Sequence, residues 1–178
     1  MNVSTIIIDD FLDNPDKVRD SALSLNFSRT GSFPGFRTDR ADHDYENYVK
    51  LKIEAVLNQS ILEFKQDSFC FQLCLEAHET WLHYDETQWA GILYLTPDAP
   101  AGAGTAIYRH IPTGTYAGPA TLDVKDTENW EIITAIGNVY NRMVLYKGQQ
   151  YHRSLISGFG QDTATGRLTQ TFFFNTER

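Results

Sequence analysis

The chain has 178 residues, which suits one domain large enough to bury roughly 70% of the surface of its unfolded state. Its formal net charge of −8 argues against a broad basic face for phosphate backbones, so we expect no nucleic-acid partner. No apolar run approaches the ~18 residues that span a bilayer, and the N-terminus lacks the basic and apolar regions of a signal peptide. We therefore expect a cytoplasmic protein with no membrane partner.

The first third of the chain predicts a strand, two helices and a long loop. A short apolar strand is expected at residues 5–8. Asn14 and Pro15 are typical of a helix start, with a capping side chain followed by proline at the first helical position. A second amphipathic helix is expected at residues 45–57. Between them, residues 28–42 are rich in Gly, Pro, Ser and Asp and predict a loop, either a binding loop or a plain surface loop, that carries Arg29, Arg37 and Arg40.

From residue 68 onward the pattern changes to short strands, expected at residues 69–76, 89–95, 104–109, 139–146 and 168–174. Asp126 or Thr127 is expected to cap one more helix, which would run through Trp130 and end at Gly137. Cys70 and Cys74 would lie roughly 13 Å apart along a strand at ~3.3 Å per residue, too far to bridge. We therefore expect free thiols in a reducing compartment.

Helices followed by many strands favour an α+β, mainly β fold whose sheet closes as a cupin-like jelly roll. The whole chain, 1–178, is interpreted as a single domain. Residues 1–67 would form an N-terminal strand with supporting helices, and residues 68–175 the jelly-roll core.

Three residues suggest a metal site. His83 and Asp85 are two residues apart, so on an extended strand both side chains would point to the same face. His152, from another strand, would complete a set of two histidines and one carboxylate. Such a set leaves coordination positions open and is typical of non-haem Fe(II) oxygenases. A His-x-Asp pair also arises by chance, and a hydrogen-bonded surface histidine is the plainer interpretation.

A candidate anion-binding pair follows on the last strand. Arg167 and Thr169 alternate with Leu168 and would face the same way, and an arginine beside a hydroxyl is suited to holding a carboxylate bidentately. An arginine that merely starts an exposed strand is the alternative. Arg153, directly after His152, competes for the same role, although on a strand it would face away from the histidine.

In this order, His83, Asp85, His152 and Arg167 resemble the motif of the Fe(II)- and 2-oxoglutarate-dependent dioxygenase superfamily, particularly its small prolyl-4-hydroxylase-like members. The resemblance covers residues 69–175, and the start of the first helix is also similar. It implies a double-stranded β-helix with the N-terminal helices packed on one sheet. It further implies that His83, Asp85 and His152 hold iron, that Arg167 binds the far carboxylate of 2-oxoglutarate, and that Thr169 assists. Fifteen residues separate His152 from Arg167, more than is usual in the family, so residues 158–166 must form an excursion.

The same resemblance implies an enzyme that uses Fe(II), the cosubstrate 2-oxoglutarate and O₂, and that releases succinate and CO₂. The C–H bond hydroxylated would belong to a peptide, an amino acid or a small metabolite, and the acidic net charge weakly favours a basic or neutral one. Tyr94 and Gln72 are candidates to hydrogen-bond the cosubstrate, although core or cross-strand packing is the favoured explanation for Tyr94. The alternative is a cupin-like module that binds a divalent metal without oxygenase activity, and the direction of the Arg167 side chain discriminates between the two. The oligomeric state stays open.

Overall fold

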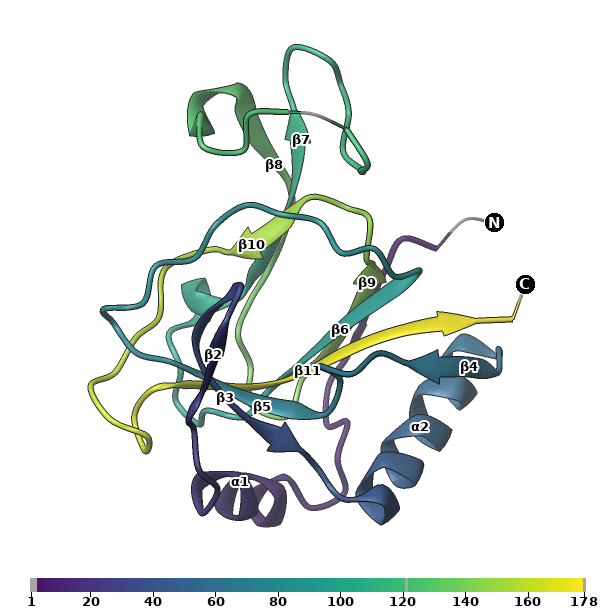
Figure 1. Ribbon diagram of the computed structural model, residues 1–178, viewed down its shortest axis with the longest axis vertical. Helices are drawn as coiled ribbons and strands as arrows, with labels where there is room; N and C mark the ends of the chain where they lie inside the picture. Colours follow the sequence, from purple (N-terminus) through teal and green to yellow (C-terminus); the bar gives the residue numbers. More distant parts are fainter. Residues whose placement is uncertain (1–2, 121, 178) are drawn as a thin grey trace.

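Two antiparallel sheets face each other in the computed structural model, which describes residues 3–120 and 122–177 (Figure 1). The larger sheet has the strand order β1-β9-β6-β11-β5-β3-β2, with β4 also paired to β11, and the smaller has the order β10-β7-β8. The larger sheet is built from β1 (Thr5–Ile8), β2 (Arg29–Gly31), β3 (Phe33–Arg40), β4 (Ile61–Phe64), β5 (Cys70–Cys74), β6 (Trp89–Tyr94), β9 (Met143–Lys147) and β11 (Arg167–Thr176). The smaller sheet contains β7 (Thr105–His110), β8 (Trp130–Ile136) and β10 (His152–Ser154). The predicted mainly β class and the strand-rich second part of the chain are confirmed.

Helices α1 (Pro15–Leu23) and α2 (His43–Leu57) pack on the outer face of the larger sheet, at the bottom of Figure 1. The Asn14 side chain caps α1 as predicted, because its Oδ1 accepts a hydrogen bond from the Lys17 amide at 3.2 Å. Ala22, Val49 and Ile53 are fully buried and join the apolar side chains of the sheet in the main core. The helices therefore cover one face of the sheet and leave its other face for the cavity.

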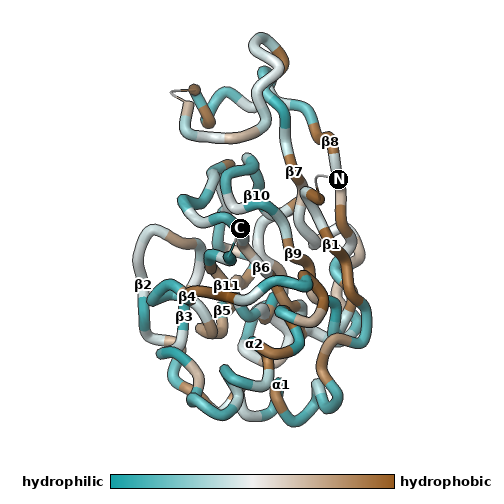
Figure 2. Tube along the Cα trace, turned by 90° about the vertical axis from the view of Figure 1, so that its right-hand side faces the viewer, coloured by the Kyte–Doolittle hydropathy of each residue, from teal (hydrophilic) through white to brown (hydrophobic). Residues whose placement is uncertain are grey.

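Strand β11 shows how one sequence serves both faces. Leu168, Phe172 and Phe174 point into the core beneath the helices, whereas Arg167 and Phe173 line the cavity on the inner face. This alternation follows from the two-residue period of a strand. Figure 2 shows the corresponding apolar stretches along β9 and β11. A smaller cluster, Ala90, Tyr94, Ile107, Ile136, Val144 and Tyr146, packs between the two sheets.

Residues 28–42, predicted as a loop, instead form the hairpin of β2 and β3, which extends the edge of the larger sheet. The prediction was wrong because Pro34 and Gly35 were taken as loop signals. Gly35 has a φ of 71°, and a Cβ there would lie 2.1 Å from the Leu73 carbonyl oxygen. The glycine thus permits β3 to lie close beside its antiparallel neighbour β5, in the register that pairs Arg37 with Gln72.

The helix predicted from Asp126 or Thr127 to Gly137 is also wrong. Asp126 does cap, but only a single 3₁₀ turn, Thr127–Asn129, and the chain then continues as β8. β-Branched residues dominate that strand, and pairing with β7 along its whole length stabilises the extended form.

Strand β4 was not predicted. In Figure 1, β7 and β8 project above the body. Leu82, Trp130 and Tyr151 form a small satellite cluster separate from the main core.

Both cysteines are buried and unbridged. A helix of the length and apolarity needed to cross a bilayer is not found among the described residues.

Candidate metal centre and its cavity

His83, Asp85 and His152 converge at one point between the sheets. One ligand atom from each lies within 4.8 Å of the other two. The two histidines are tied through their own backbones: the His83 amide donates to the His152 carbonyl at 3.1 Å, and the His152 amide donates to the His83 carbonyl at 2.8 Å. Residues 69 positions apart are therefore held side by side by main-chain hydrogen bonds.

Backbone carbonyls fix which nitrogen of each imidazole is free. Nδ1 of His83 lies 3.0 Å from the Trp81 carbonyl oxygen, and Nδ1 of His152 lies 2.8 Å from the Gln150 carbonyl oxygen. A carbonyl only accepts, so each Nδ1 carries the hydrogen and each Nε2 keeps a free lone pair. Burial, and to a smaller extent the neighbouring His83 ring, lowers the pKa of His152 to about 3, which keeps the His152 ring neutral.

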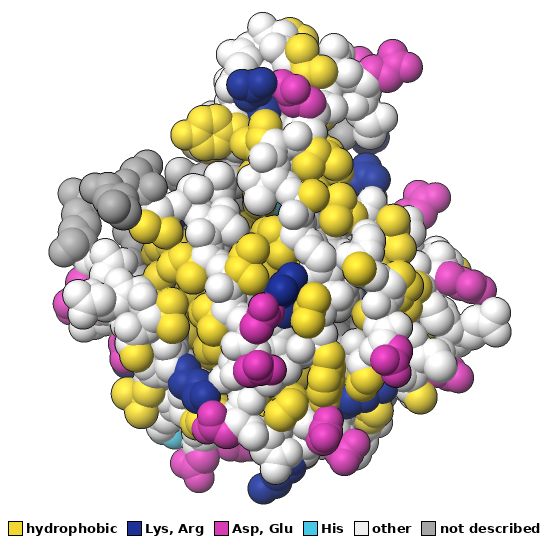
Figure 3. Space-filling model, turned by 180° about the vertical axis from the view of Figure 1, so that it is seen from behind, with side chains coloured by type: hydrophobic (Ala, Val, Ile, Leu, Met, Phe, Trp, Pro, Cys, Tyr) yellow, Lys and Arg dark blue, Asp and Glu magenta, His cyan; other side chains and the backbone are white. Residues whose placement is uncertain are grey.

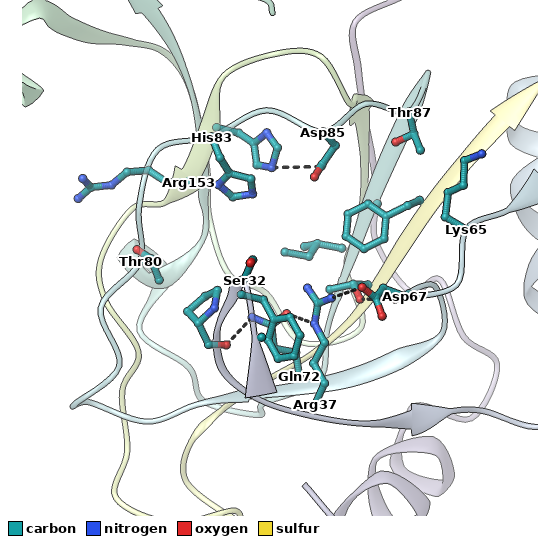
Figure 4. Close-up of a pocket in the computed structure, with 18 of the residues that line it drawn as sticks. Ser32, Arg37, Lys65, Asp67, Gln72, Thr80, His83, Asp85, Thr87 and Arg153 are labelled. Carbon is teal, nitrogen blue, oxygen red and sulfur yellow. Dashed lines mark hydrogen bonds and ion pairs between the residues drawn. The ribbon is translucent and has the colours of Figure 1, made fainter. Parts of the chain in front are cut away.

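Asp85 supplies the third donor. Its Oδ2 is buried and accepts no hydrogen bond from the described residues, and it lies 3.5 Å from Nε2 of His152 (Figure 4). Burial raises the pKa of Asp85, while the neighbouring His83 and Arg37 side chains oppose this rise. A buried carboxylate oxygen with no donor is costly unless a cation completes its surroundings.

The three residues open onto a cavity of about 900 Å³. Its basic character contrasts with the acidic chain. On the outer surface in Figure 3, basic side chains are interspersed with acidic and apolar ones. The cavity instead carries more basic than acidic side chains. Its basic residues are Arg29, Arg37, Lys65, Arg153 and Arg167, and its acidic residues are Asp67, Asp85 and Glu86.

Arg167 lies in the wall of this cavity and is 2% exposed. Its Nε donates to the Ala103 carbonyl oxygen at 3.1 Å, and its guanidinium carbon lies 5.6 Å from the centre of the Tyr94 ring. Its Nη2 is buried without a hydrogen-bond partner, and no carboxylate of the described residues forms an ion pair with it. A buried guanidinium without a counter-ion is a site for an anion from outside the chain.

The remaining predicted residues lie in a row across the larger sheet. Gln72 on β5 pairs with Thr169 on β11, which pairs with Tyr94 on β6. Gln72 lines the cavity, whereas Thr169 and Tyr94 are buried behind its wall. The Tyr94 hydroxyl shares a 2.7 Å hydrogen bond with the Thr105 hydroxyl, and Thr105 does reach the cavity. The roles assigned to Thr169 and Tyr94 stay predictions.

Arg153, the competing anchor, also borders the cavity. Its Nε lies 3.3 Å from the Ser154 carbonyl oxygen, and its guanidinium points away from the two imidazoles in Figure 4. The sequence interpretation did not assign a role to Arg37, which reaches the cavity from β3. Its only sequence signal was an arginine in a segment predicted to be a loop.

Two facing antiparallel sheets that enclose a cluster of two histidines and one aspartate define a double-stranded β-helix. The chain belongs to the Family of unknown function (DUF6445), whose sequence pattern matches residues 2–123 and 116–174. No curated protein was found that matches the sequence.

Solved structures share the fold at low sequence identity. A prolyl-4-hydroxylase from Pseudomonas putida is 16% identical, with a TM-score of 0.53 over 98% of this chain and 93% of its own. A prolyl hydroxylase from Trichoplax adhaerens, in complex with a peptide fragment of the hypoxia inducible factor oxygen degradation domain, is 10% identical, with a TM-score of 0.60 over 96% and 83%. HygX from Streptomyces hygroscopicus, with nickel, 2-oxoglutarate and hygromycin B bound, is 11% identical, with a TM-score of 0.64 over 96% and 82%. These similarities establish the double-stranded β-helix.

Proposed function

We propose that this protein is a non-haem Fe(II)- and 2-oxoglutarate-dependent oxygenase that hydroxylates a C–H bond of its substrate. One observation carries the proposal: the cavity that contains the two-histidine, one-aspartate cluster also contains a buried guanidinium without a counter-ion. The first feature suits a divalent metal, and the second suits the far carboxylate of a dicarboxylate cosubstrate. The similar folds of metal- and 2-oxoglutarate-bound proteins support the assignment.

The residues fit a divalent metal. The Nε2 atoms of His83 and His152 have free lone pairs because their Nδ1 atoms donate to backbone carbonyls, and Oδ2 of Asp85 lacks a donor. Imidazole and carboxylate ligands on one side of an ion are the set used by non-haem Fe(II) sites. We assign these three residues as the metal ligands.

Arg167 fits the role of cosubstrate anchor. The Ala103 carbonyl fixes its Nε, so the fork is already oriented and little side-chain freedom remains to be lost on binding. A carboxylate at this position would satisfy the buried Nη2. Tyr94 is assigned a supporting role, because its ring lies beside the guanidinium and its hydroxyl orients Thr105. Thr169, which is buried beside Tyr94 behind the cavity wall, is assigned the same supporting role in cosubstrate binding.

With iron, 2-oxoglutarate and O₂ bound, the site would supply oxidative decarboxylation to succinate and CO₂ coupled to hydroxylation of the substrate. The chain itself holds the ligands in place and keeps the buried His152 imidazole neutral. The cavity's size suits a small molecule, an amino acid or the end of a peptide.

Anaerobic titration of the Fe(II)-loaded protein with 2-oxoglutarate tests the proposal. We expect the weak visible absorption band that accompanies chelation of Fe(II) by 2-oxoglutarate, and we expect Arg167→Ala to require more 2-oxoglutarate to reach it. If metal binds through His83, Asp85 and His152 but no band forms, the protein is instead a metal-binding module. If the protein binds no divalent metal, only the jelly-roll fold stands and the metal site is wrong.

A further inference from the structure

A second buried arginine, Arg37, faces the cavity from strand β3. Its side chain is 8% exposed, and its Nε donates to Oε1 of Gln72 at 2.8 Å. No other hydrogen bond from its guanidinium is formed within the described residues. Figure 4 shows this guanidinium across the cavity from the two histidines and Asp85. The edge of its fork therefore faces the space that a substrate would occupy.

The charge of Arg37 is only partly compensated. Among the described residues, the one carboxylate within ion-pair distance is that of Asp67, whose Oδ2 lies 3.7 Å from Nη1 of Arg37, beyond hydrogen-bond length. The same carboxylate is already engaged by Arg29, whose Nη2 donates to Oδ1 at 2.8 Å. Two guanidinium groups thus share one carboxylate. Lys65 also borders the cavity, but its charge is paired with Glu63.

The guanidinium of Arg37 is also held in place before any ligand arrives. Its central carbon lies 4.1 Å from the centre of the Phe33 ring and 5.8 Å from that of Phe173. Gln72 in turn is fixed by a hydrogen bond from its Nε2 to the Pro34 carbonyl oxygen at 2.9 Å. A planar fork clamped between rings and an amide is arranged to receive a planar carboxylate with little loss of freedom.

Arg37 and Arg167 belong to different parts of the cavity wall. Arg167 begins β11 and is fixed by Ala103, whereas Arg37 comes from the β2–β3 hairpin and is fixed by Gln72. Both line the same cavity with the metal cluster. If 2-oxoglutarate occupies the Arg167 side, Arg37 remains available to a second anion.

We propose that Arg37 binds a carboxylate of the primary substrate, and that the substrate is therefore a small organic acid. This inference rests on the proposed oxygenase function. It also reverses the expectation drawn from the net charge of −8, because the cavity rather than the whole surface meets the substrate. The organic acid would enter between Phe33, Phe173 and the metal cluster, with its carboxylate on the Arg37 fork.

The test uses protein loaded with Ni(II) and saturating 2-oxoglutarate, so that the Arg167 side is occupied. Isothermal titration compares benzoate, N-benzoylglycine and N-acetylleucine, each with its neutral carboxamide. For at least one pair we expect the acid to bind about 10-fold more tightly than the amide to the wild type. Arg37→Gln should reduce this ratio to about 1–2, and Arg37→Lys should give an intermediate value because it keeps the charge but loses the fork. Lys65→Gln is the matched control, and it should leave the ratio within about twofold because exposed charges contribute little.

The Asp67→Asn variant is an independent test, and its expected effect on the acid-to-amide ratio is opposite to that of Arg37→Gln. It removes the carboxylate that competes for Arg37, so the preference for acids should increase. Absence of an Arg37-dependent acid preference in every pair, or loss of 2-oxoglutarate affinity in Arg37→Gln, would overturn the proposal. If 2-oxoglutarate binding depends on Arg167 but no acid is preferred, the oxygenase assignment survives and the substrate class fails. If the acid preference is found without any 2-oxoglutarate binding, the cavity binds acids but the proposed function fails.

Discussion

The two ends of the cavity are built in different ways. At the metal end, backbone atoms set the positions: the two histidines pair with each other through their amides, and each ring is oriented by a carbonyl two residues earlier. At the hairpin end, side chains set the positions, because Arg37 is held by Gln72 and by aromatic rings. A site oriented by the backbone shows itself as a short motif, whereas a site oriented by side chains from distant strands leaves no local pattern.

The largest effect should come from the metal end. His152→Ala removes one of the three proposed ligands, so Ni(II) affinity measured by titration should fall by more than the roughly 10- to 100-fold that loss of an outer hydrogen-bond partner costs. His110→Ala is the matched control, because that ring packs against Trp130 at an interplanar angle of 55° and does not line the cavity. Equal affinity in His152→Ala and wild type would remove the metal centre from this position.

The next largest effect should be on the hairpin. Gly35→Ala places a methyl group 2.1 Å from the Leu73 carbonyl oxygen at a positive φ, so urea unfolding should show a loss of about 2–4 kcal/mol. Gly102→Ala meets no atom within 4 Å and should change stability by less than about 0.5 kcal/mol. If both variants are equally stable, the close approach of β3 to β5 at Gly35 does not set the position of Arg37.

A third comparison separates the two candidate anchors. Arg167→Ala should raise the dissociation constant for 2-oxoglutarate by about 10- to 100-fold, the range expected for hydrogen bonds to a charged group, while Ni(II) affinity stays within about threefold. Arg153→Ala should leave both constants nearly unchanged, because its guanidinium points away from the histidines. The reverse result would transfer the anchor role to Arg153.

The smallest effect is expected for Tyr94→Phe. The ring still fills the space between the sheets, but the Thr105 hydroxyl loses its 2.7 Å partner, so stability should fall by about 1 kcal/mol. Affinity for 2-oxoglutarate, measured on the same sample, should weaken only a few-fold if Tyr94 acts through Thr105. A loss as large as that of Arg167→Ala would show that Tyr94 contacts the cosubstrate directly.

The sequence allowed prediction of the elements whose signals are local. The two-residue spacing of His83 and Asp85 and the period of β11 required no knowledge of distant partners. The helix start at Asn14 was equally local, and its cap forms as expected. These patterns were sufficient to predict the fold class and the three candidate metal-binding residues, which converge in the structure.

The remaining features depend on contacts between distant segments. Trp130 and Ile133 occur at helical spacing after a capping residue. The segment nevertheless forms a strand, because it pairs with the edge of β7 that β10 does not occupy. Likewise, nothing near Arg37 in the sequence indicates that Gln72, 35 residues away, will hold its side chain. Pairing with β7 overrides the helical spacing of β8. Pairing of β3 with β5 makes a strand of the segment predicted as a loop and places Arg37 beside Gln72.

The two reciprocal backbone hydrogen bonds between His83 and His152 affect how a metal ion would enter the site. Because the chain brings both imidazoles together during folding, the arriving ion does not need to gather them from separate loops. Metal uptake should then be limited by diffusion through the cavity mouth and by shedding of the ion's water, without a slow rearrangement of the protein.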